Sequence, residues 1–256
     1  MTIHRNSEID PTADLGTGVR VGPFSTIGPG VKIGDRTEIG PNVCIHQSTF
    51  VGADCRIFHG ASIGGDPQIK DARDISSSVE IGEGTTVREF VTIHRSAKEN
   101  ETTFVGKKCL IMAYVHLAHD CVVGDEVVIV NGTELSGHII VEGSAFISGM
   151  VGAHQFVRFG KLSMTGGMSR IVKDIPPFCT VEGSPARLIG TNALGLKRAG
   201  IIPSVRSGLK KAVRFLMHND LNTTQAIKKI EEEIEISDDI RYLVNFVNQS
   251  NRGIIR

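Results

Sequence analysis

Isoleucine, leucine or valine recurs at every sixth residue along most of this chain. The register runs from Ile3 to Ile63, resumes from Ile81 to Ile93, and continues from Val105 to Ile171. Of its 26 positions, 23 are Ile, Leu or Val, and the others are Ala153, Phe159 and Thr165. A helix repeats every 3.6 residues and a strand every 2, so a six-residue period indicates a repeat architecture.

The remaining positions of the hexad fit the same architecture. We call each recurring Ile, Leu or Val position an anchor. The residue directly after an anchor is often glycine. The residue four places after an anchor is small or β-branched, as in Ser25, Val31 and Thr37. We expect the anchors to fill a narrow three-sided prism, the small residues to lie near its corners, and the glycines to serve turns with positive φ. Three hexads would form one 18-residue coil of parallel strands. The predicted fold class is therefore mainly β, a parallel β-helix.

The pattern also predicts the domain organisation. The register is interrupted by polar segments at about 65–78 and 95–104, which we expect to be loops extruded from the coils, where function collects in solenoids. The solenoid spans 1–189, and a small α-helical domain spans 190–256. The predicted helices are 203–218, 222–236 and 238–249, with Thr223 or Thr224 and then Ser237 as N-caps. This domain would cover the open edge of the last coil.

Composition excludes several classes of function. The 256 residues carry 28 basic and 28 acidic side chains, which gives no reason to expect a nucleic-acid partner. No apolar run is long enough for a membrane span, and the polar start at Met1 does not resemble a signal peptide. Cys55, Cys109 and Cys121 occupy the small core positions, so we expect buried thiols rather than disulfides or metal ligands, as suits the cytoplasm.

The candidate chemistry is a group of histidines. His116, His119, His138 and His154 all lie off the anchor and core positions, so they point outward or sit at turns. Asp120 follows His119 and is 18 residues before His138, which places the two at equivalent sites on successive coils.

Three interpretations of this group compete. The histidines are ordinary surface residues, or three of them bind zinc between subunits, or one is a general base. A histidine has an ordinary pKa of about 6.5 and is suited to take a proton from a hydroxyl near neutral pH. An adjacent carboxylate would orient it, and a backbone N–H would hold an oxyanion.

Several runs make the third interpretation specific. The chain reads HLAHDC at 116–121, LSGH at 135–138, AHQF at 153–156, DIPPF at 174–178, GLKRAG at 195–200 and RGIIR at 252–256. These runs resemble the UDP-N-acetylglucosamine O-acyltransferase family of lipid A synthesis, across essentially the whole chain. The resemblance implies a left-handed β-helix. It also implies transfer of an (R)-3-hydroxyacyl chain from acyl carrier protein, through its phosphopantetheine arm, to the 3-OH of UDP-N-acetylglucosamine. It implies no other cofactor and no metal.

The resemblance also assigns roles to residues. It makes His119 the base, Asp120 its orienting carboxylate and the Gly137 N–H the oxyanion donor. Gly167 would set the acyl length and suggests a longer chain. The substrate-binding residues would be Gln68, Lys70, His116, His138, His154, Gln155, Asn192 and Arg198.

The chain departs from the family pattern at the acceptor end. The first loop reads Gln68-Ile69-Lys70-Asp71 where the family has Gln-Asp-Leu-Lys, and Leu194 and Ala199 replace an acid and an arginine. An alternative acceptor is therefore a 3-amino sugar nucleotide, which would give an amide, or the chain is another sugar N-acyltransferase. A non-catalytic β-helix scaffold is the alternative in which the His119–Asp120 pair has no role.

Two assemblies are also expected. Flat prism faces pack around a threefold axis, so we expect a homotrimer with sites between subunits. Residues 190–220 carry six basic side chains against Asp220 alone, a net of +5. We expect Arg206, Lys210, Lys211 and Arg214 to form a docking patch for the acidic carrier protein; a solvated helix face is the alternative.

Overall fold

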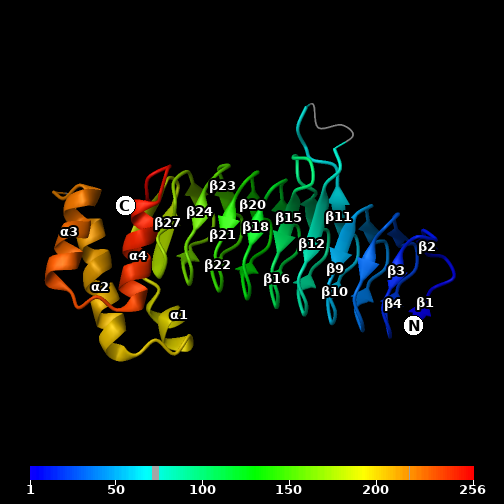
Figure 1. Ribbon diagram of the computed structural model, residues 1–256, viewed down its shortest axis with the longest axis horizontal. Helices are drawn as coiled ribbons and strands as arrows, with labels where there is room; N and C mark the ends of the chain where they lie inside the picture. Colours follow the sequence, from blue (N-terminus) through cyan, green and yellow to red (C-terminus); the bar gives the residue numbers. More distant parts are fainter. Residues whose placement is uncertain (71–74, 219) are drawn as a thin grey trace.

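The computed structural model describes residues 1–70, 75–218 and 220–256. The hexads form a left-handed parallel β-helix with three flat faces, and the four helices lie at its C-terminal end (Figure 1). This confirms the fold class predicted from the six-residue period.

Each face of the prism is one sheet of short strands. Face 1 has eleven strands in the order β1 (Thr2–Ile3), β4 (Arg20–Val21), β7 (Glu38–Ile39), β10 (Arg56–Ile57), β13 (Thr86–Val87), β16 (Leu110–Ile111), β19 (Val128–Ile129), β22 (Phe146–Ile147), β25 (Met164–Thr165), β27 (Cys179–Gly183) and β28 (Ala186–Thr191). Face 2 has nine, β2 (Glu8–Ile9), β5 (Thr26–Ile27), β8 (Cys44–Ile45), β11 (Ser62–Gly65), β14 (Thr92–His94), β17 (His116–Leu117), β20 (Glu134–Leu135), β23 (Gly152–Ala153) and β26 (Arg170–Ile171). Face 3 has eight, β3 (Asp14–Leu15), β6 (Lys32–Ile33), β9 (Thr49–Val51), β12 (Ser78–Ile81), β15 (Thr102–Val105), β18 (Val122–Val123), β21 (Ile140–Val141) and β24 (Arg158–Phe159).

The anchors form the core, as the hexad pattern predicts. Every anchor from Val21 to Ile171 is at most 5% exposed, including Ala153, Phe159 and Thr165. Strands pair in register, so an anchor such as Ile111 lies directly between Val87 and Ile129. The interior is therefore a continuous column of aliphatic side chains that holds successive coils at fixed positions.

Positive φ explains Gly18, Gly30, Gly60, Gly84 and Gly132, but it does not explain the glycines directly after an anchor, where that prediction is wrong. Positive φ falls three residues after the anchor, where non-glycine residues such as Phe24 and Arg36 also stand. The glycines directly after an anchor instead allow the coils to approach each other. A Cβ on Gly34 would lie 2.4 Å from the Ala53 nitrogen on the next coil, so any larger residue would push the coils apart.

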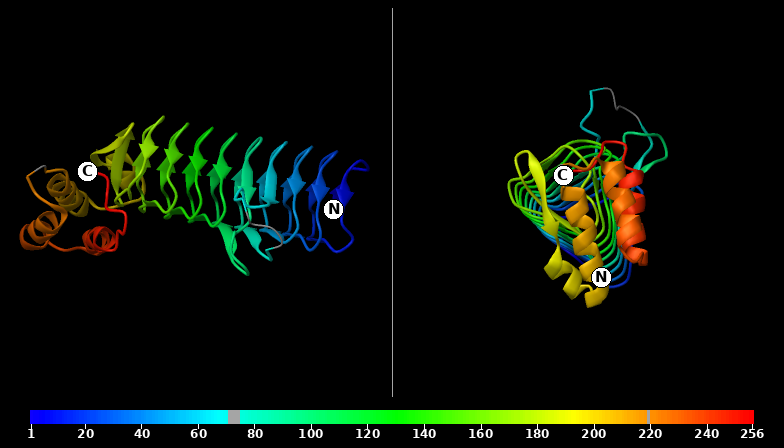
Figure 2. Two further views of the ribbon diagram at one scale, coloured as in Figure 1. Left: turned by 90° about the horizontal axis from the view of Figure 1, so that it is seen from above. Right: turned by 90° about the vertical axis from the view of Figure 1, so that its left-hand side faces the viewer.

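Both interruptions of the register emerge at one corner of the prism. Residues 66–77 connect β11 to β12, and residues 95–101 connect β14 to β15, so each joins face 2 to face 3. The end view shows both projecting from the same side of the triangular section (Figure 2). We call this edge, with its turns at 119–120 and 137–138, the loop corner. Residues 71–74 of the predicted first loop lie outside the described residues.

The C-terminal segment closes the solenoid. β28 turns back antiparallel to β27, and the helices α1 (Ala193–Arg198), α2 (Pro203–Met217), α3 (Thr223–Glu233) and α4 (Asp238–Asn248) follow. Ser237 caps α4 as predicted. Asn222, not Thr223 or Thr224, caps α3, because its side chain forms a capping box with Gln225. The short α1 and the β27–β28 hairpin were not predicted.

Polar contacts fix the C-terminal segment to the last coils. The Asp174 side chain, 1% exposed, accepts hydrogen bonds from the Ser250 hydroxyl at 2.7 Å and from the Arg158 N–H at 2.8 Å. The Tyr242 hydroxyl donates to Glu142 Oε2 at 2.8 Å. No helix in the described ranges has the length and apolar character needed to cross a bilayer.

Candidate active site

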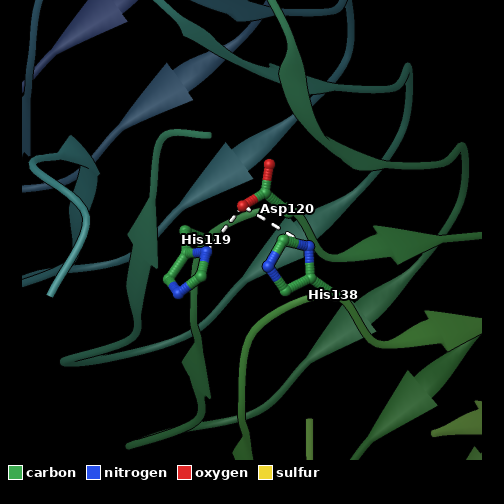
Figure 3. Close-up of side chains that lie close together, drawn as sticks. All are labelled: His119, Asp120 and His138. Atoms are coloured by element: carbon green, nitrogen blue, oxygen red, sulfur yellow. Dashed lines mark hydrogen bonds and ion pairs between the residues drawn. The ribbon is translucent and has the colours of Figure 1, made fainter. Parts of the chain in front are cut away.

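His119 and Asp120 form a close pair at the loop corner. They follow β17, at the turn that leads from face 2 to β18 on face 3. The His119 Nδ1 lies 2.6 Å from Asp120 Oδ2, and the two side chains are only 12% and 8% exposed. Asp120 has a φ of +60°, the left-handed conformation that places consecutive side chains around the corner. Figure 3 shows the carboxylate between two imidazoles.

The Asp120 carboxylate is held by the second loop. The Ser96 hydroxyl donates to Oδ1, and the Ala97 N–H donates to Oδ2 at 3.3 Å. The Asp120 N–H itself donates to the Thr103 hydroxyl at 2.8 Å. Burial alone would raise the pKa of Asp120, but the hydrogen bonds from Ser96 and His119 hold it below its ordinary 3.8. The carboxylate is thus ionised at neutral pH and available to orient an imidazole.

His138 flanks the same carboxylate from the next coil. Its Nδ1 is 3.6 Å from Asp120 Oδ2, and its ring meets that of His119 edge-on at 5.0 Å. Phe156, one coil further, stacks on the other side of His138 at 4.5 Å between ring centroids. Partial burial lowers the pKa of His138, which favours its neutral form despite the nearby Asp120.

Gly137 occupies the corner position below His119. A methyl group there would lie 2.6 Å from His119 Cε1 and 2.7 Å from Nε2, so only glycine leaves room for the imidazole. The hydrogen bonds between described residues leave the Gly137 N–H unused. The sequence therefore leaves an unused backbone donor at the corner that packs against the His119 ring.

The other predicted histidines lie around this pair. His116 is on the outer surface of face 2, where its Nδ1 is 2.8 Å from the Thr92 hydroxyl. Burial and the neighbouring His94 lower the pKa of His116. His154 and Gln155 are exposed at the equivalent corner one coil beyond Gly137. Gln68 and Lys70 are exposed on the first loop.

Asn192 and Arg198 lie elsewhere in the chain. Together with Leu194 and Ala199 they line a cavity of about 460 Å³ against face 1, next to Phe146 and Met164. The Asn192 side chain is already used locally, because it caps α1 through the Gly195 N–H at 3.0 Å and donates to the Leu162 carbonyl at 2.9 Å. Within one chain, these two residues are therefore on a different face from His119.

The acyl-length candidate and the basic helix are also separate from the pair. Gly167 is exposed at the corner between faces 1 and 2, where an added Cβ would have its nearest contact, 3.4 Å, with the Gly149 carbonyl. On α2, Lys210 and Arg214 are exposed, whereas Arg206 is half-buried. Lys211 is paired with Glu233, whose Oε2 lies 3.4 Å from the Lys211 Nζ and whose backbone carbonyl accepts a hydrogen bond from it at 2.9 Å.

Ser96 and Phe156, which were not predicted, complete the surroundings of the pair. The available signal was the second register gap, which starts at the same corner one coil before Asp120. The shift from 18 to 24 residues between Ser96 and Asp120 obscures that relation.

One group in the described part of the chain has the chemistry of a metal site. The candidate ligand atoms of His119, Asp120 and His138 lie within 4.8 Å of one another. Both Nδ1 atoms, however, face the same carboxylate oxygen, which already accepts a hydrogen bond from the Ala97 N–H. A structural zinc site generally uses four ligands. The expectation that no metal is needed stays a prediction.

The chain is similar to known acyltransferases along its length. The family described as Udp N-acetylglucosamine O-acyltransferase, Domain 2, matches residues 174–255, and bacterial transferase hexapeptide repeats match 12–47 and 102–137. The solved UDP-N-acetylglucosamine acyltransferase of Bacteroides fragilis 9343 is 38% identical, superposes with a TM-score of 0.96, and is matched over 99% of both chains. This chain belongs to the UDP-N-acetylglucosamine O-acyltransferase family.

Two curated members of the family illustrate the relationship. Both are named acyl-[acyl-carrier-protein]–UDP-N-acetylglucosamine O-acyltransferase. The protein from Gloeothece citriformis (strain PCC 7424) is 46% identical over 169 residues, which is 66% of this chain and 61% of the relative. The protein from Burkholderia mallei (strain SAVP1) is 41% identical over 180 residues, which is 68% of this chain and 69% of the relative. The match to the first relative thus spans less than two thirds of that protein.

Proposed function

We propose that this chain is an acyltransferase that moves an (R)-3-hydroxyacyl group from acyl carrier protein to the 3-OH of UDP-N-acetylglucosamine, the first step of lipid A synthesis. The observation that carries the proposal is the 2.6 Å pair of His119 and Asp120 at the loop corner, with Gly137 packed closely against the ring. Family membership gives the substrate class, since the relatives are named for it.

The reaction follows from this geometry. With Nδ1–H donating to Asp120, the lone pair of His119 is on Nε2, and it accepts the proton of the acceptor hydroxyl. The alkoxide oxygen attacks the thioester carbonyl, and the Gly137 N–H donates a hydrogen bond to the resulting oxyanion. The intermediate then collapses, the carbon–sulfur bond breaks, and the imidazolium returns the proton to the departing pantetheine thiolate.

Asp120 contributes by fixing the tautomer and by stabilising the imidazolium electrostatically. Its low pKa means that it stays ionised while His119 cycles between neutral and charged forms. His116, His138, His154 and Gln155 would contact the sugar, the phosphates or the pantetheine arm, since they lie on the coil of the pair or on the next two coils.

The position of Asn192 and Arg198 supports a homotrimer. They line a cavity against face 1, whereas His119 is at the corner between faces 2 and 3. If they bind the nucleotide end of the acceptor, as the family resemblance implies, they must come from a neighbouring subunit. We propose that three prisms pack around a threefold axis and that each site forms between two of them.

The donor and the compartment complete the proposal. Lys210 and Arg214 on α2 would attract the acidic carrier protein, and Gly167 would permit a longer acyl chain. The four buried thiols at Cys55, Cys109, Cys121 and Cys179 suit a reducing cytoplasm.

A 3-amino sugar nucleotide is the second candidate acceptor. Leu194 and Ala199, which replace an acid and an arginine of the family pattern, line the same cavity as Asn192 and Arg198. The residues expected to bind the acceptor are therefore where this chain departs from the family pattern.

A mass-spectrometric assay tests both candidates. The protein is supplied with (R)-3-hydroxyacyl carrier proteins of several chain lengths and with each sugar nucleotide. An ester product from UDP-N-acetylglucosamine is expected. Faster formation of an amide would establish the alternative, and no transfer to either acceptor would contradict the proposed function.

A further inference from the structure

The base of the first loop is held by one buried arginine. Arg95, 4% exposed, donates to Asp66 Oδ1 from Nε at 3.1 Å and from Nη2 at 3.0 Å. Its Nη1 donates to the Ser77 hydroxyl at 2.9 Å and to the Ile75 carbonyl. One guanidinium therefore binds both ends of the loop, at Asp66 where it leaves the coil and at Ile75 to Ser77 where it returns.

The next residue binds the carboxylate of the active-site pair. Ser96 is fully buried and donates its hydroxyl to Asp120 Oδ1. Its carbonyl accepts a hydrogen bond from the Ser77 hydroxyl at 2.6 Å. A continuous set of hydrogen bonds thus runs from Asp66 through Arg95, Ser77 and Ser96 to Asp120.

We propose that Arg95 and Ser96 are positioning residues that couple the placement of the first loop to the orientation of the His119–Asp120 pair. This inference rests on the proposed function, because it assigns the first loop to the acceptor and His119 to the base. It adds that the two parts of the site are one hydrogen-bonded unit.

The role of Ser96 follows from competition for one oxygen. Asp120 Oδ2 lies 2.6 Å from His119 Nδ1 and 3.6 Å from His138 Nδ1. An aspartate side chain can rotate about its Cα–Cβ and Cβ–Cγ bonds, so its carboxylate can turn toward either imidazole. Holding Oδ1 with the Ser96 hydroxyl fixes that rotation, so that Oδ2 stays with His119.

The role of Arg95 follows from the geometry of its donors. A guanidinium presents several N–H groups in a rigid plane, and here they reach Asp66, Ile75 and Ser77 together. A lysine at this position would carry the same charge but bind fewer of these acceptors. The buried cation is therefore used for its shape, and the exposed Asp66 side chain provides its counter-charge.

Ser96→Ala tests the first half of the proposal. Loss of a hydrogen bond to a charged group predicts a kcat lowered roughly 10- to 100-fold. The KM for the sugar nucleotide should stay within about twofold, and Ser96→Thr should recover most of kcat. In an Asp120→Asn background, Ser96→Ala should have little further effect, because Ser96 acts through that carboxylate. Wild-type kcat in Ser96→Ala, or a full additional loss in the double variant, would overturn the inference.

Arg95→Lys tests the coupling to the loop. It should raise the KM for the sugar nucleotide, lower kcat, and increase amide hydrogen exchange in the peptide Ser62–Gln68. Arg36→Lys is the matched control, since Arg36 forms an exposed pair with Asp54 on the early coils. Unchanged KM and unchanged exchange in Arg95→Lys would refute the coupling. Turnover by the wild type decides the proposed function separately, and the exchange measurement does not depend on it.

Discussion

Two corners of the same coil turn at a residue with the same left-handed φ, but their surfaces are very different. Tyr114, at the corner between faces 1 and 2, and Asp120, at the loop corner, both have φ of +60°. Tyr114 is 61% exposed and stacks on Phe90 at 5.2 Å, whereas the Asp120 side chain is 8% exposed and hydrogen-bonded to a second loop. The turn itself does not determine the chemistry. The inserted loop partly buries one corner, and burial strengthens the electrostatic contacts made there.

The largest difference between the corners should appear when a histidine is removed from each. His119→Ala should lower kcat about 10²- to 10⁴-fold, because it removes the base while the aliphatic core is untouched. His59→Ala, which removes an exposed histidine beside Phe90 at the other corner, should leave kcat near the wild-type value. Steady-state kinetics with a thermal unfolding control measures both. Equal losses of kcat in the two variants would contradict a special catalytic role for the loop corner.

A smaller loss is expected from adding a methyl group below the ring. Gly137→Ala places a Cβ 2.6 Å from His119 Cε1, so the imidazole must move, and a shift of about 1 Å can cost roughly 10²-fold in kcat. Gly143 occupies the same turn position at the next corner, and its added Cβ would have its nearest contact at 3.4 Å. Gly143→Ala should therefore be nearly neutral. Normal kcat in Gly137→Ala would refute the close packing of this corner.

Charge reversal on α2 should affect the donor alone. Lys210→Glu should raise the KM for acyl carrier protein roughly twofold to tenfold at low salt and less at high salt, because exposed charges contribute little and are screened. The KM for the sugar nucleotide should not change. Lys32→Glu, on face 3 of an early coil, is the control. If Lys210→Glu leaves the KM for acyl carrier protein at the wild-type value at every ionic strength, α2 presents only a solvated face.

The smallest effect concerns pH and stability. Burial lowers the pKa of His116, so below pH 6.5 the unfolded chain binds more protons at this residue than the folded chain does. The contribution of His116 to the free energy of unfolding is therefore fully present above pH 6.5 and is lost as the pH falls through its lowered pKa in the folded chain. His116→Gln should reduce the decline in thermal midpoint between pH 7.5 and 5 by about 2 to 4 °C at most. An unchanged pH dependence would argue against a half-buried imidazole that stays neutral in the folded chain.

The sequence predicted the solenoid well because each coil repeats one packing problem. An anchor such as Ile111 meets only its counterparts above and below, so the six-residue period contains the whole contact pattern of the core. The pair of His119 and Asp120 was also accessible, since the two are adjacent in the chain. Ser96 and Arg95 were not, because the inserted loop lengthens the spacing between Ser96 and Asp120 to 24 residues. Phe156 keeps the regular 18-residue spacing from His138, so the hexad register could have placed it beside that ring. The separation of Asn192 from His119 depends on which faces the hexads form, and the six-residue period alone does not assign a hexad to a face.

The claim that His119 is a general base is tested most directly by chemical rescue. The His119→Ala variant is assayed for acyl transfer with increasing imidazole at several pH values. The account predicts that imidazole restores turnover and that the rate follows the concentration of the neutral base, rising with pH through the pKa of imidazole. His59→Ala should show no such dependence. Rescue that follows imidazolium and falls as the pH rises would contradict the assignment of His119 as the base.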